Sequence, residues 1–464
     1  MELKFPKGFL WGAATSSHQV EGGNVNDWSE WEYANSARLA KEATLRPALR
    51  RRLWQGEQAQ GKKPWPDYIL SGYPNPLQPA NYISGRACDH YNRFREDFDI
   101  AKSLGHNAHR FSIEWSRVEP SEGKFDAKEI EHYRQVILAL TAQRVEPFVT
   151  LWHYTHPAWF AKRGGWLHPK AKESFLNFVE KIVSEYKGNV KYWLTFNEPE
   201  TVVRHGYIQA IRLPQERSLR KAFKMLKVLV QTHNDAYQLI HKITDGKAAV
   251  GFAESLVFFE TYNNWPQNVF LMKFLDWYRN QQFVPKVIKN TDFIGLNYYF
   301  HSRVRFNPFV SWKWFQYNEN KLGLSDVSWE IYPEGIYKML MILKKYNKPI
   351  FITENGIADA KDGKRTMYIK EYCRYIHKAI SEGADVKGHF YWSFLDNFEW
   401  SDGFWPRFGL VEINYKTLER KIRPSAWEYA KICKSNVIAS DDADLAEKRG
   451  PLRSREGEAS DPEI

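Results

Sequence analysis

Two glutamates in the sequence each follow a buried-strand pattern, and together they could act on one bond. Glu198 closes the run 190–197 and precedes Pro199, which cannot donate to a sheet ladder and therefore ends the strand near Glu198. Glu354 follows the mainly apolar run 349–353 and precedes a glycine-containing turn. Two carboxylates at strand ends are the minimum equipment for cleaving a glycosidic bond.

Two neighbouring carboxylates would not carry equal charge. If both were ionised they would repel, so the pKa of one rises and that group can act as a general acid while the other stays a nucleophile. The residues alone do not assign the two roles. Tyr299 and Arg110 could orient and stabilise the charged partner. Glutamates that serve only in structural ion pairs are the alternative interpretation of the same pattern.

The elements that must position these glutamates alternate between strand and helix patterns. Strand patterns fall at 9–16, 108–115, 146–152, 190–197, 248–253, 293–299, 349–354 and 386–393, and helix patterns at 89–104, 127–143, 170–187, 217–244, 267–289, 333–346 and 366–382. This alternation predicts α/β architecture, and we expect one (β/α)8 TIM barrel with long strand-to-helix loops over residues 1–436. A doubly wound open sheet is the alternative, but it would show a Gly-rich phosphate turn after its first strand, and 19–23 is not one.

Two segments lie outside this alternation. Residues 30–86 are too long for a structureless loop, so we expect a helix or two that folds over one rim of the protein. The tail 437–464 becomes polar and poor in apolar residues from about Ser440, and we expect it to be disordered.

Composition excludes several classes of protein. The 464 residues are 43% hydrophobic and 26% charged, which is ordinary for a globular protein, and no apolar stretch is long enough to span a membrane. The first residues lack the basic and apolar regions of a signal peptide. The cysteines, Cys88, Cys373 and Cys433, are few, far apart and odd in number. We therefore expect no disulfide framework, no zinc site and a cytoplasmic location.

The net charge of +11 could indicate a nucleic-acid or anionic membrane partner. However, the basic residues gather in 46–52 and 212–227 without forming a recognisable binding module, and a solvated helix face explains both runs more simply. We expect neither partner. The aromatic content of 16%, with 19 Trp, is unusual. Indole faces stack on sugar rings, but a large aromatic core would give the same composition.

The side chains predicted at the strand ends indicate what kind of ligand they would bind. They are Gln19, Arg110, His153, Asn197, Glu198, Asn297, Tyr299, Glu354 and Trp392. Amides, an imidazole, a phenol and an indole suit a neutral ligand rich in hydroxyls, whereas phosphate would require a basic cluster or helix N-termini. A catalytic metal would require converging His and carboxylates, and His153 with His156 is weak support for one. We expect no metal and no cofactor.

Ordered motifs over about residues 4–435 resemble those of family 1 glycoside hydrolases, the β-glucosidase family. The motifs are Phe5-Pro6, 9–17, Gln19 with Glu21-Gly22, 110–117, Asn197-Glu198-Pro199, Trp329 to Pro333, 352–356, 391–393, 395–400 and 407–410. So many matches in the same order are specific.

The resemblance implies a retaining mechanism. Glu354 would attack the anomeric carbon, and Glu198 would protonate the leaving oxygen and then activate water, with the two carboxyl groups about 5–5.5 Å apart. Asn197 would hold the 2-hydroxyl of the sugar. Arg110 and Tyr299 would flank the nucleophile, with Asn297 supporting the same group.

The resemblance also implies how the sugar is held. Gln19, His153, Glu399 and Trp400 would bind the hydroxyls of the glycone, Trp392 would stack on its ring, and Trp329 would border the aglycone. Glu399 followed by Trp400 fits an unphosphorylated glycone. The expected activity is that of an exo-acting β-glucosidase with β-galactosidase or β-fucosidase activity on small β-glycosides or short oligosaccharides. The alternatives are a transglycosylase that uses the same glycosyl-enzyme and a catalytically silent sugar-binding barrel.

Several positions depart from the family pattern. Tyr154 stands where the family usually has Trp, and Phe404 stands where Tyr is usual. The loop after Glu198 is short, whereas 30–86 is enlarged and its basic part, 36–63, could form a secondary partner surface. These loops would build the aglycone side, so the resemblance assigns the two catalytic glutamates but no leaving-group preference.

Overall fold

The computed structural model describes residues 2–45, 65–306, 315–316 and 322–438 of the chain. Its main sheet has the strand order β6-β5-β4-β3-β2-β10-β9-β7-β8, and an additional pairing of β6 with β7 closes it. Apart from β8, which pairs antiparallel with β7, every neighbouring pair is parallel. The predicted (β/α)8 barrel is confirmed, and the β6–β7 pairing rules out the open sheet.

The elements have the following bounds. The barrel strands are β2 (Leu10–Ala14), β3 (Ala108–Ser112), β4 (Glu146–Trp152), β5 (Tyr192–Asn197), β6 (Ala249–Thr261), β7 (Phe293–Arg305), β9 (Ile350–Asn355) and β10 (Val386–Trp392). The short strands outside the barrel are β1 (Leu3–Lys4), β8 (Phe315–Gln316), β11 (Val411–Ile413), β12 (Arg420–Ile422) and β13 (Val437–Ile438).

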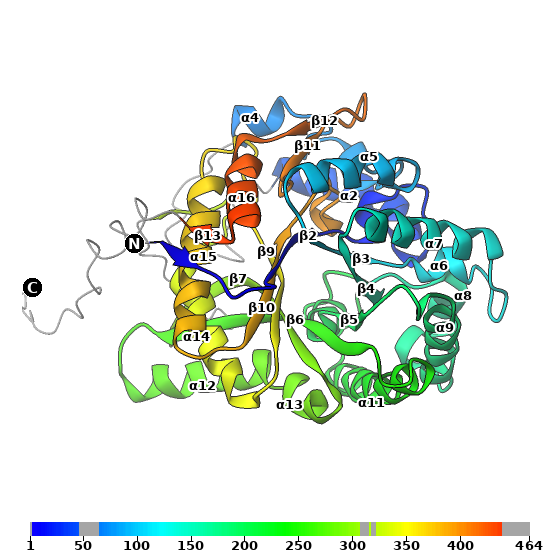
Figure 1. Ribbon diagram of the computed structural model, residues 1–464. Helices are drawn as coiled ribbons and strands as arrows, with labels where there is room; N and C mark the ends of the chain where they lie inside the picture. The colour runs from blue at the N-terminus through cyan, green and yellow to red at the C-terminus, as the bar shows by residue number, and fades with distance from the viewer. Residues whose placement is uncertain (1, 46–64, 307–314, 317–321, 439–464) are drawn as a thin grey trace, which may run out of the picture.

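Helices surround the strands on all sides in Figure 1. The long ones are α2 (Asp27–Leu45), α5 (His90–Ser103), α7 (Ala127–Ala142), α9 (Ala171–Tyr186), α11 (Leu219–Ile243), α12 (Pro266–Asn280), α14 (Pro333–Leu343), α15 (Arg365–Ser381) and α16 (Pro424–Ser435). The short α-helices are α1 (Ser17–Val20), α4 (Asp67–Leu70), α6 (Trp115–Val118), α8 (Ala158–Lys162), α10 (Pro199–Val203) and α13 (Val284–Val287). The remaining turns are η1 (Pro79–Tyr82), η2 (Gly165–Leu167), the π-helix η3 (Arg204–Ile208), η4 (Ile288–Asn290), η5 (Lys344–Tyr346) and η6 (Trp400–Asp402).

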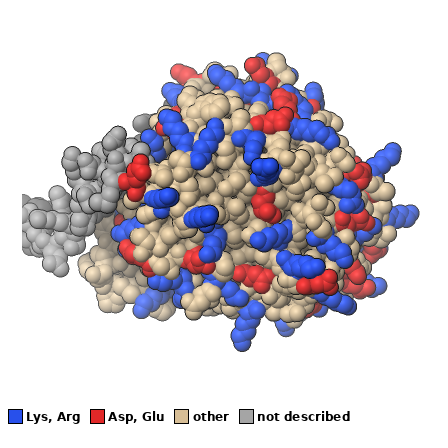
Figure 2. Space-filling model, viewed as in Figure 1, with Lys and Arg blue, Asp and Glu red and all other residues tan. Residues whose placement is uncertain are grey.

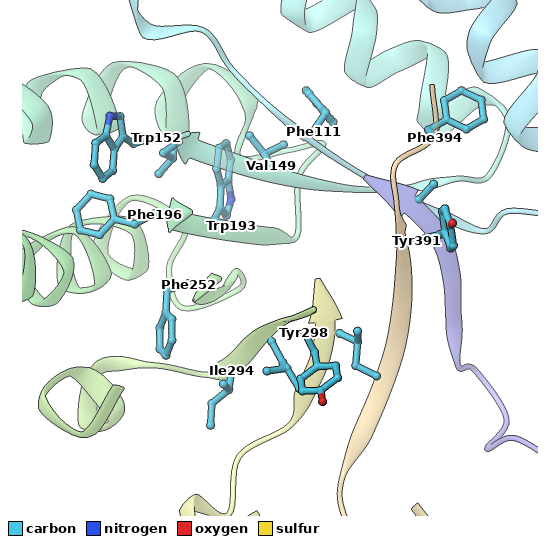
Figure 3. Close-up of a cluster of buried hydrophobic side chains, with 14 of the residues drawn as sticks. Phe111, Val149, Trp152, Trp193, Phe196, Phe252, Ile294, Tyr298, Tyr391 and Phe394 are labelled. Atoms are coloured by element: carbon cyan, nitrogen blue, oxygen red, sulfur yellow. The ribbon is translucent and has the colours of Figure 1, made fainter. Parts of the chain in front are cut away.

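Alternate residues of the strands face opposite sides of the barrel wall, and both sides are apolar. The inner cluster includes Ala14, Ala108, Phe148, Leu194, Ala253, Phe293, Phe351 and Phe390. The ring of Phe148 on β4 lies 4.7 Å from that of Phe390 on β10 and 5.1 Å from that of Phe351 on β9, so these side chains meet across the interior. The outer cluster, part of which Figure 3 shows, packs against the helices and includes Phe111, Val149, Trp152, Trp193, Phe196, Phe252, Ile294, Tyr298, Tyr391 and Phe394. Burial on both faces is typical of parallel strands covered by helices and sets their register.

Two predicted elements differ in extent. The helix expected over 267–289 ends at Asn280, because Pro285 cannot continue a helix interior and instead lies in the first turn of α13, which begins at Val284. The strand expected over 248–253 continues to Thr261 in β6, where Asn280 exchanges hydrogen bonds of 2.9 and 2.8 Å with the backbone N–H and C=O of Val257.

The enlarged segment 30–86 carries the expected helices, in α2, α4 and η1. Within α2, Trp28 packs 4.7 Å from the ring of Trp400, and the buried Glu32 lies 2.7 Å from His18 and accepts from Ser84. This helix therefore covers the rim that bears Trp400. The expectation of a disordered tail from residue 437 is wrong for its first two residues, because β13 (Val437–Ile438) pairs with β1 (Leu3–Lys4). Residues 439–464 and most of the basic part of the enlarged segment lie outside the described residues.

The surface carries charges of both signs. Figure 2 shows Lys and Arg interspersed with Asp and Glu on the face drawn. On α11, Arg220, Lys221, Lys224 and Lys227 are exposed, as predicted for a solvated helix face. In the described part of the chain, none of the helices combines the length and apolar character that crossing a membrane requires.

Candidate active site

A cavity at the carboxyl ends of the strands brings most of the predicted site residues together. Those that line it are His153, Asn197, Glu198, Tyr299, Trp329, Glu354, Trp392, Glu399 and Trp400. Gln19, Arg110 and Asn297 are fully or almost fully buried and lie behind this lining, in hydrogen-bond contact with it.

Glu354 is held by a hydrogen bond to each of its carboxyl oxygens. Arg110, on β3, donates to Oε1 at 2.6 Å, and the Tyr299 hydroxyl, on β7, donates to Oε2 at 2.9 Å. Burial raises the pKa of Glu354 to about 7, the Arg110 guanidinium lowers it, and the charge of Glu198 raises it further. The carboxyl is thus fixed in orientation and can exist in both protonation states near neutral pH.

Glu198 occupies a strained backbone conformation at the end of β5. Its φ of 46° and ψ of 56° lie in the left-handed region, which favours glycine, and its N–H donates to the C=O of Ala253 at 2.8 Å. The Tyr154 hydroxyl donates to Oε2 at 2.5 Å, and the Asn297 amide donates to Oε1 at 2.9 Å. Strain of this kind persists where surrounding contacts hold the residue in place. Here the hydrogen bonds from Tyr154 and Asn297 hold the carboxyl of Glu198.

A chain of hydrogen bonds joins the two glutamates. Asn197 Oδ1 accepts from Arg110 at 2.7 Å and from Asn297 at 3.1 Å. Since Arg110 also holds Glu354 and Asn297 also holds Glu198, the connection runs from one carboxyl to the other without a gap. A buried network whose members share partners is rigid, so the separation of the two carboxyls is set by the barrel.

The far end of the cavity carries a third carboxyl. Glu399 accepts a long contact of 3.4 Å from Gln19, whose amide also donates to the C=O of Phe398 at 2.8 Å. Burial raises the pKa of Glu399 to about 8, although Arg212 lowers it. Gln19 therefore supports the loop after β10, and its role as a glycone ligand stays a prediction.

Aromatic rings form the walls of the cavity. The His153 ring lies nearly parallel to the rings of Trp392 and Trp400, with centroids 6.1 and 6.0 Å away. The Trp329 ring, which also lines the cavity, lies 5.5 Å from that of Tyr299. Apolar ring faces next to polar edges suit sugar rings, which have apolar faces and hydroxyl rims.

The motif after Glu354 contains Gly356, and the structure requires a glycine at this position. A Cβ at this position would overlap the backbone C=O of Trp392. Only glycine therefore allows the ends of β9 and β10 to approach closely enough to bring Glu354 and Trp392 to one cavity.

Sequence reasoning missed several side chains of the cavity. Tyr154 departs from the family pattern and the sequence assigns it no contact, although its position directly after His153 at a strand end is a usable signal. Arg204, His205 and Arg212 also line the cavity. The expectation that Arg212 belongs to a solvated helix face is wrong, because α11 begins at Leu219 and Arg212 lies in the preceding turn.

The histidine that was considered as a metal ligand has another partner. His156 Nδ1 lies 2.7 Å from Oδ2 of Asp27, at the start of α2. Within residues 2–45, 65–306, 315–316 and 322–438, no group of three or more His, Cys, Asp and Glu side chains could hold a metal ion.

Comparison with known proteins identifies the family. The sequence matches the family described as Glycosyl hydrolase family 1 over residues 58–270 and 279–438. The chain belongs to glycosyl hydrolase family 1. It is an O-glycosyl hydrolase, and family 1 enzymes act on β-glycosides with retention of configuration.

Relatives in the family match almost end to end. β-Glucosidase A from Thermotoga maritima is 30% identical over 94% of this chain and 99% of its own length. A β-galactosidase from Pyrococcus woesei is 27% identical over 90% of this chain and 94% of its own. Among solved structures, a β-glycosidase from Pyrococcus horikoshii is 35% identical with a TM-score of 0.79, covering 96% of this chain and 98% of its own.

The buried Glu399 of this family 1 enzyme makes stability depend on pH. Because its folded-state pKa is about 8 against an ordinary 4.5, the native protein holds this proton more tightly than the unfolded chain, and the contribution of Glu399 to stability is lost as pH rises from about 4.5 to about 8. We expect Glu399→Gln to raise the Tm by about 3 °C or more at pH 9 and to leave it nearly unchanged at pH 4. Calorimetry across this range measures the difference. The exposed Glu412→Gln is the control, and an equal Tm shift at both pH values would contradict the assignment.

Proposed function

We propose that this enzyme is a retaining, exo-acting β-glycosidase that hydrolyses terminal, unphosphorylated β-D-glycosides, chiefly β-glucosides and also β-galactosides or β-fucosides. The single observation that carries the proposal is the pair Glu198 and Glu354, joined through Arg110, Asn197 and Asn297 at the carboxyl ends of β5 and β9. The relatives named β-glucosidase and β-galactosidase support the choice of sugars. A Thermotoga maritima relative solved with glucoimidazole, 28% identical with a TM-score of 0.77, supports a sugar in this cavity.

In the first step, Glu354 attacks the anomeric carbon and forms a glycosyl ester. The bond to the leaving oxygen breaks as that oxygen takes a proton from Glu198. Arg110 and Tyr299 hold the two oxygens of Glu354, so the attacking carboxylate cannot rotate away. In this proposal the Asn197 amide binds the 2-hydroxyl of the sugar; its Oδ1 accepts from Arg110 and its Nδ2 lies 3.1 Å from His153 Nε2.

In the second step, Glu198 acts as a base and Glu354 is the leaving group. The ester at Glu354 is neutral, so the repulsion that opposes a negative charge on Glu198 disappears, and Glu198 takes a proton from water. The water oxygen attacks the anomeric carbon, and Glu354 leaves as a carboxylate. Two displacements return the β configuration. A sugar or alcohol in place of water would give transglycosylation by the same route.

We also propose a cytoplasmic location for the enzyme. Cys88, Cys373 and Cys433 are all buried free thiols, which is the state expected in a reducing compartment.

The substrate assignment predicts the outcome of a simple assay. Nitrophenyl β-glucoside, β-galactoside and β-fucoside should be hydrolysed, the 6-phosphoglucoside should not, and proton NMR should detect the β-anomer first. First release of the α-anomer would contradict retention. If none of the glycosides is cleaved but the protein still binds glucose-like inhibitors, it is a silent sugar-binding barrel.

The roles of the two glutamates predict different rescue products. With Glu354→Ala, azide should occupy the place of the missing nucleophile and give the α-glycosyl azide from a β-glycoside with an activated leaving group. With Glu198→Ala, azide should attack the glycosyl ester and give the β-glycosyl azide. Each substitution should lower kcat by about 10³-fold or more before rescue. NMR of the products checks this, and exchanged configurations would reverse the assignment.

The contact of Tyr154 with Glu198 predicts a dependence on the leaving group. Without this hydroxyl, Oε2 of Glu198 loses its hydrogen-bond donor, and the carboxyl that protonates the leaving oxygen is held less firmly. Tyr154→Phe should therefore lower kcat/KM by about tenfold for alkyl glucosides, whose leaving oxygen must be protonated. Dinitrophenyl glucoside, which departs without protonation, should be hardly affected. Tyr237→Phe, which loses a 2.9 Å hydrogen bond to Asp292 outside the barrel, is the matched control. Equal losses for both substrates would mean that Tyr154 acts only through folding.

A further inference from the structure

The part of the cavity wall that follows Glu198 in the chain is basic. Arg204 and His205 lie on the π-helix η3, and Arg212 lies in the turn before α11. All three line the cavity together with Thr201. Arg212 and His205 also line a smaller recess beside Tyr154.

Several nitrogen atoms of these basic side chains have no hydrogen-bond partner. The Nε atoms of Arg204 and Arg212 and both ring nitrogens of His205 are buried without a hydrogen bond, and Arg204 otherwise donates to Gln209 at 3.2 Å. Within the described part of the chain, no ion pair joins Arg204 or Arg212 to a carboxylate. Buried cations and donors without partners are costly, and functional sites are where such groups persist.

The positive charges also lie close to one another. Burial and the neighbouring Arg279 lower the pKa of Arg204 to about 9, with Arg212 adding to the effect. Burial and the charges of Arg204 and Arg212 lower the pKa of His205 well below its usual range, so His205 is neutral and offers one N–H donor. An anion would relieve this repulsion and supply the missing acceptors.

The carboxyls of the cavity offset the positive charge of this wall only in part. Glu198 is engaged by Tyr154 and Asn297, and Asp27, which lines the recess, pairs with His156. The Arg212 guanidinium lowers the pKa of Glu399, so its charge also acts on that carboxyl. Because Glu399 and Asp402 lie together in the loop after β10, an anion on the glycone would have to approach acidic side chains there.

The chain order associates the basic wall with the leaving group. Glu198 protonates the leaving oxygen in the proposed function. Arg204 lies six residues further along the same segment, and the charge of Glu198 raises the pKa of Arg204 against the lowering by burial. We propose that Arg204, His205 and Arg212 form an anion-binding subsite for the leaving group, so that preferred substrates are β-glucosides whose aglycone carries a carboxylate, sulfate or phosphate. This inference rests on the proposed β-glycosidase activity.

The test compares two glucosides that differ only in charge, 4-carboxyphenyl and 4-carbamoylphenyl β-D-glucoside. The native enzyme should show a kcat/KM about tenfold higher for the carboxylate, as expected for charge-assisted hydrogen bonds to a partly solvated group. This ratio should shrink between about 20 mM and about 500 mM salt, because salt screens the attraction. In Arg204→Gln and Arg212→Gln the ratio should fall toward one, and Arg212→Lys should restore part of it.

The ratio is measured within each variant, so a general loss of activity does not change it. Arg220→Gln, which removes an exposed charge on α11, should keep the native ratio. A native ratio near one, or a ratio that survives both glutamine substitutions, would overturn the subsite. If nitrophenyl β-glucuronide were cleaved faster than the glucoside, and Arg212→Gln abolished this difference, the anion would belong to the glycone. That result would also overturn the leaving-group subsite. Failure to cleave even neutral glucosides would instead refute the proposed function.

Discussion

The contacts of the Arg110 guanidinium are the interaction on which the rest of the site depends. From β3, this one side chain donates to Glu354 on β9, to Asn197 on β5 and to Thr150 on β4. It is 1% exposed, so its charge is stable only because these acceptors surround it. β3 and β9 are not neighbours in the sheet. Their side chains meet across the interior because the barrel is closed, and Phe148 and the apolar side chains around it fill that interior.

The site concentrates features that cost stability. Glu198, Tyr154 and Trp400 have φ values of 46°, 75° and 48°, in the left-handed region that disfavours residues with a Cβ. Burial raises the pKa of both Glu354 and Glu399. Two apolar clusters, one inside the barrel and one between the strands and the helices, stabilise the strands that carry these strained and buried residues.

The two ends of the cavity differ in chemistry. Trp392, Trp400 and Glu399 form an aromatic and acidic end that suits the hydroxyls of a sugar. Tyr154 stands at the boundary, with its hydroxyl on Glu198 and its ring 4.7 Å from that of Trp400. Beyond it, the segment after Glu198 supplies basic groups, several of whose nitrogen atoms have no hydrogen-bond partner. These basic groups lie where the proposed subsite for the leaving group would be.

The sequence by itself determined the barrel and both glutamates, because the alternation of apolar strands with amphipathic helices allows few folds and because parallel strands bring their carboxyl ends to one rim. Local signals, such as Pro199 after Glu198, fixed where the strands stop. What only the tertiary structure decided was which side chains meet across that rim: the hydroxyl of Tyr154 on Glu198, and Arg212 in the cavity rather than on a helix surface. Those contacts join residues far apart in the chain through irregular turns, and no periodicity in the sequence specifies how such turns fold.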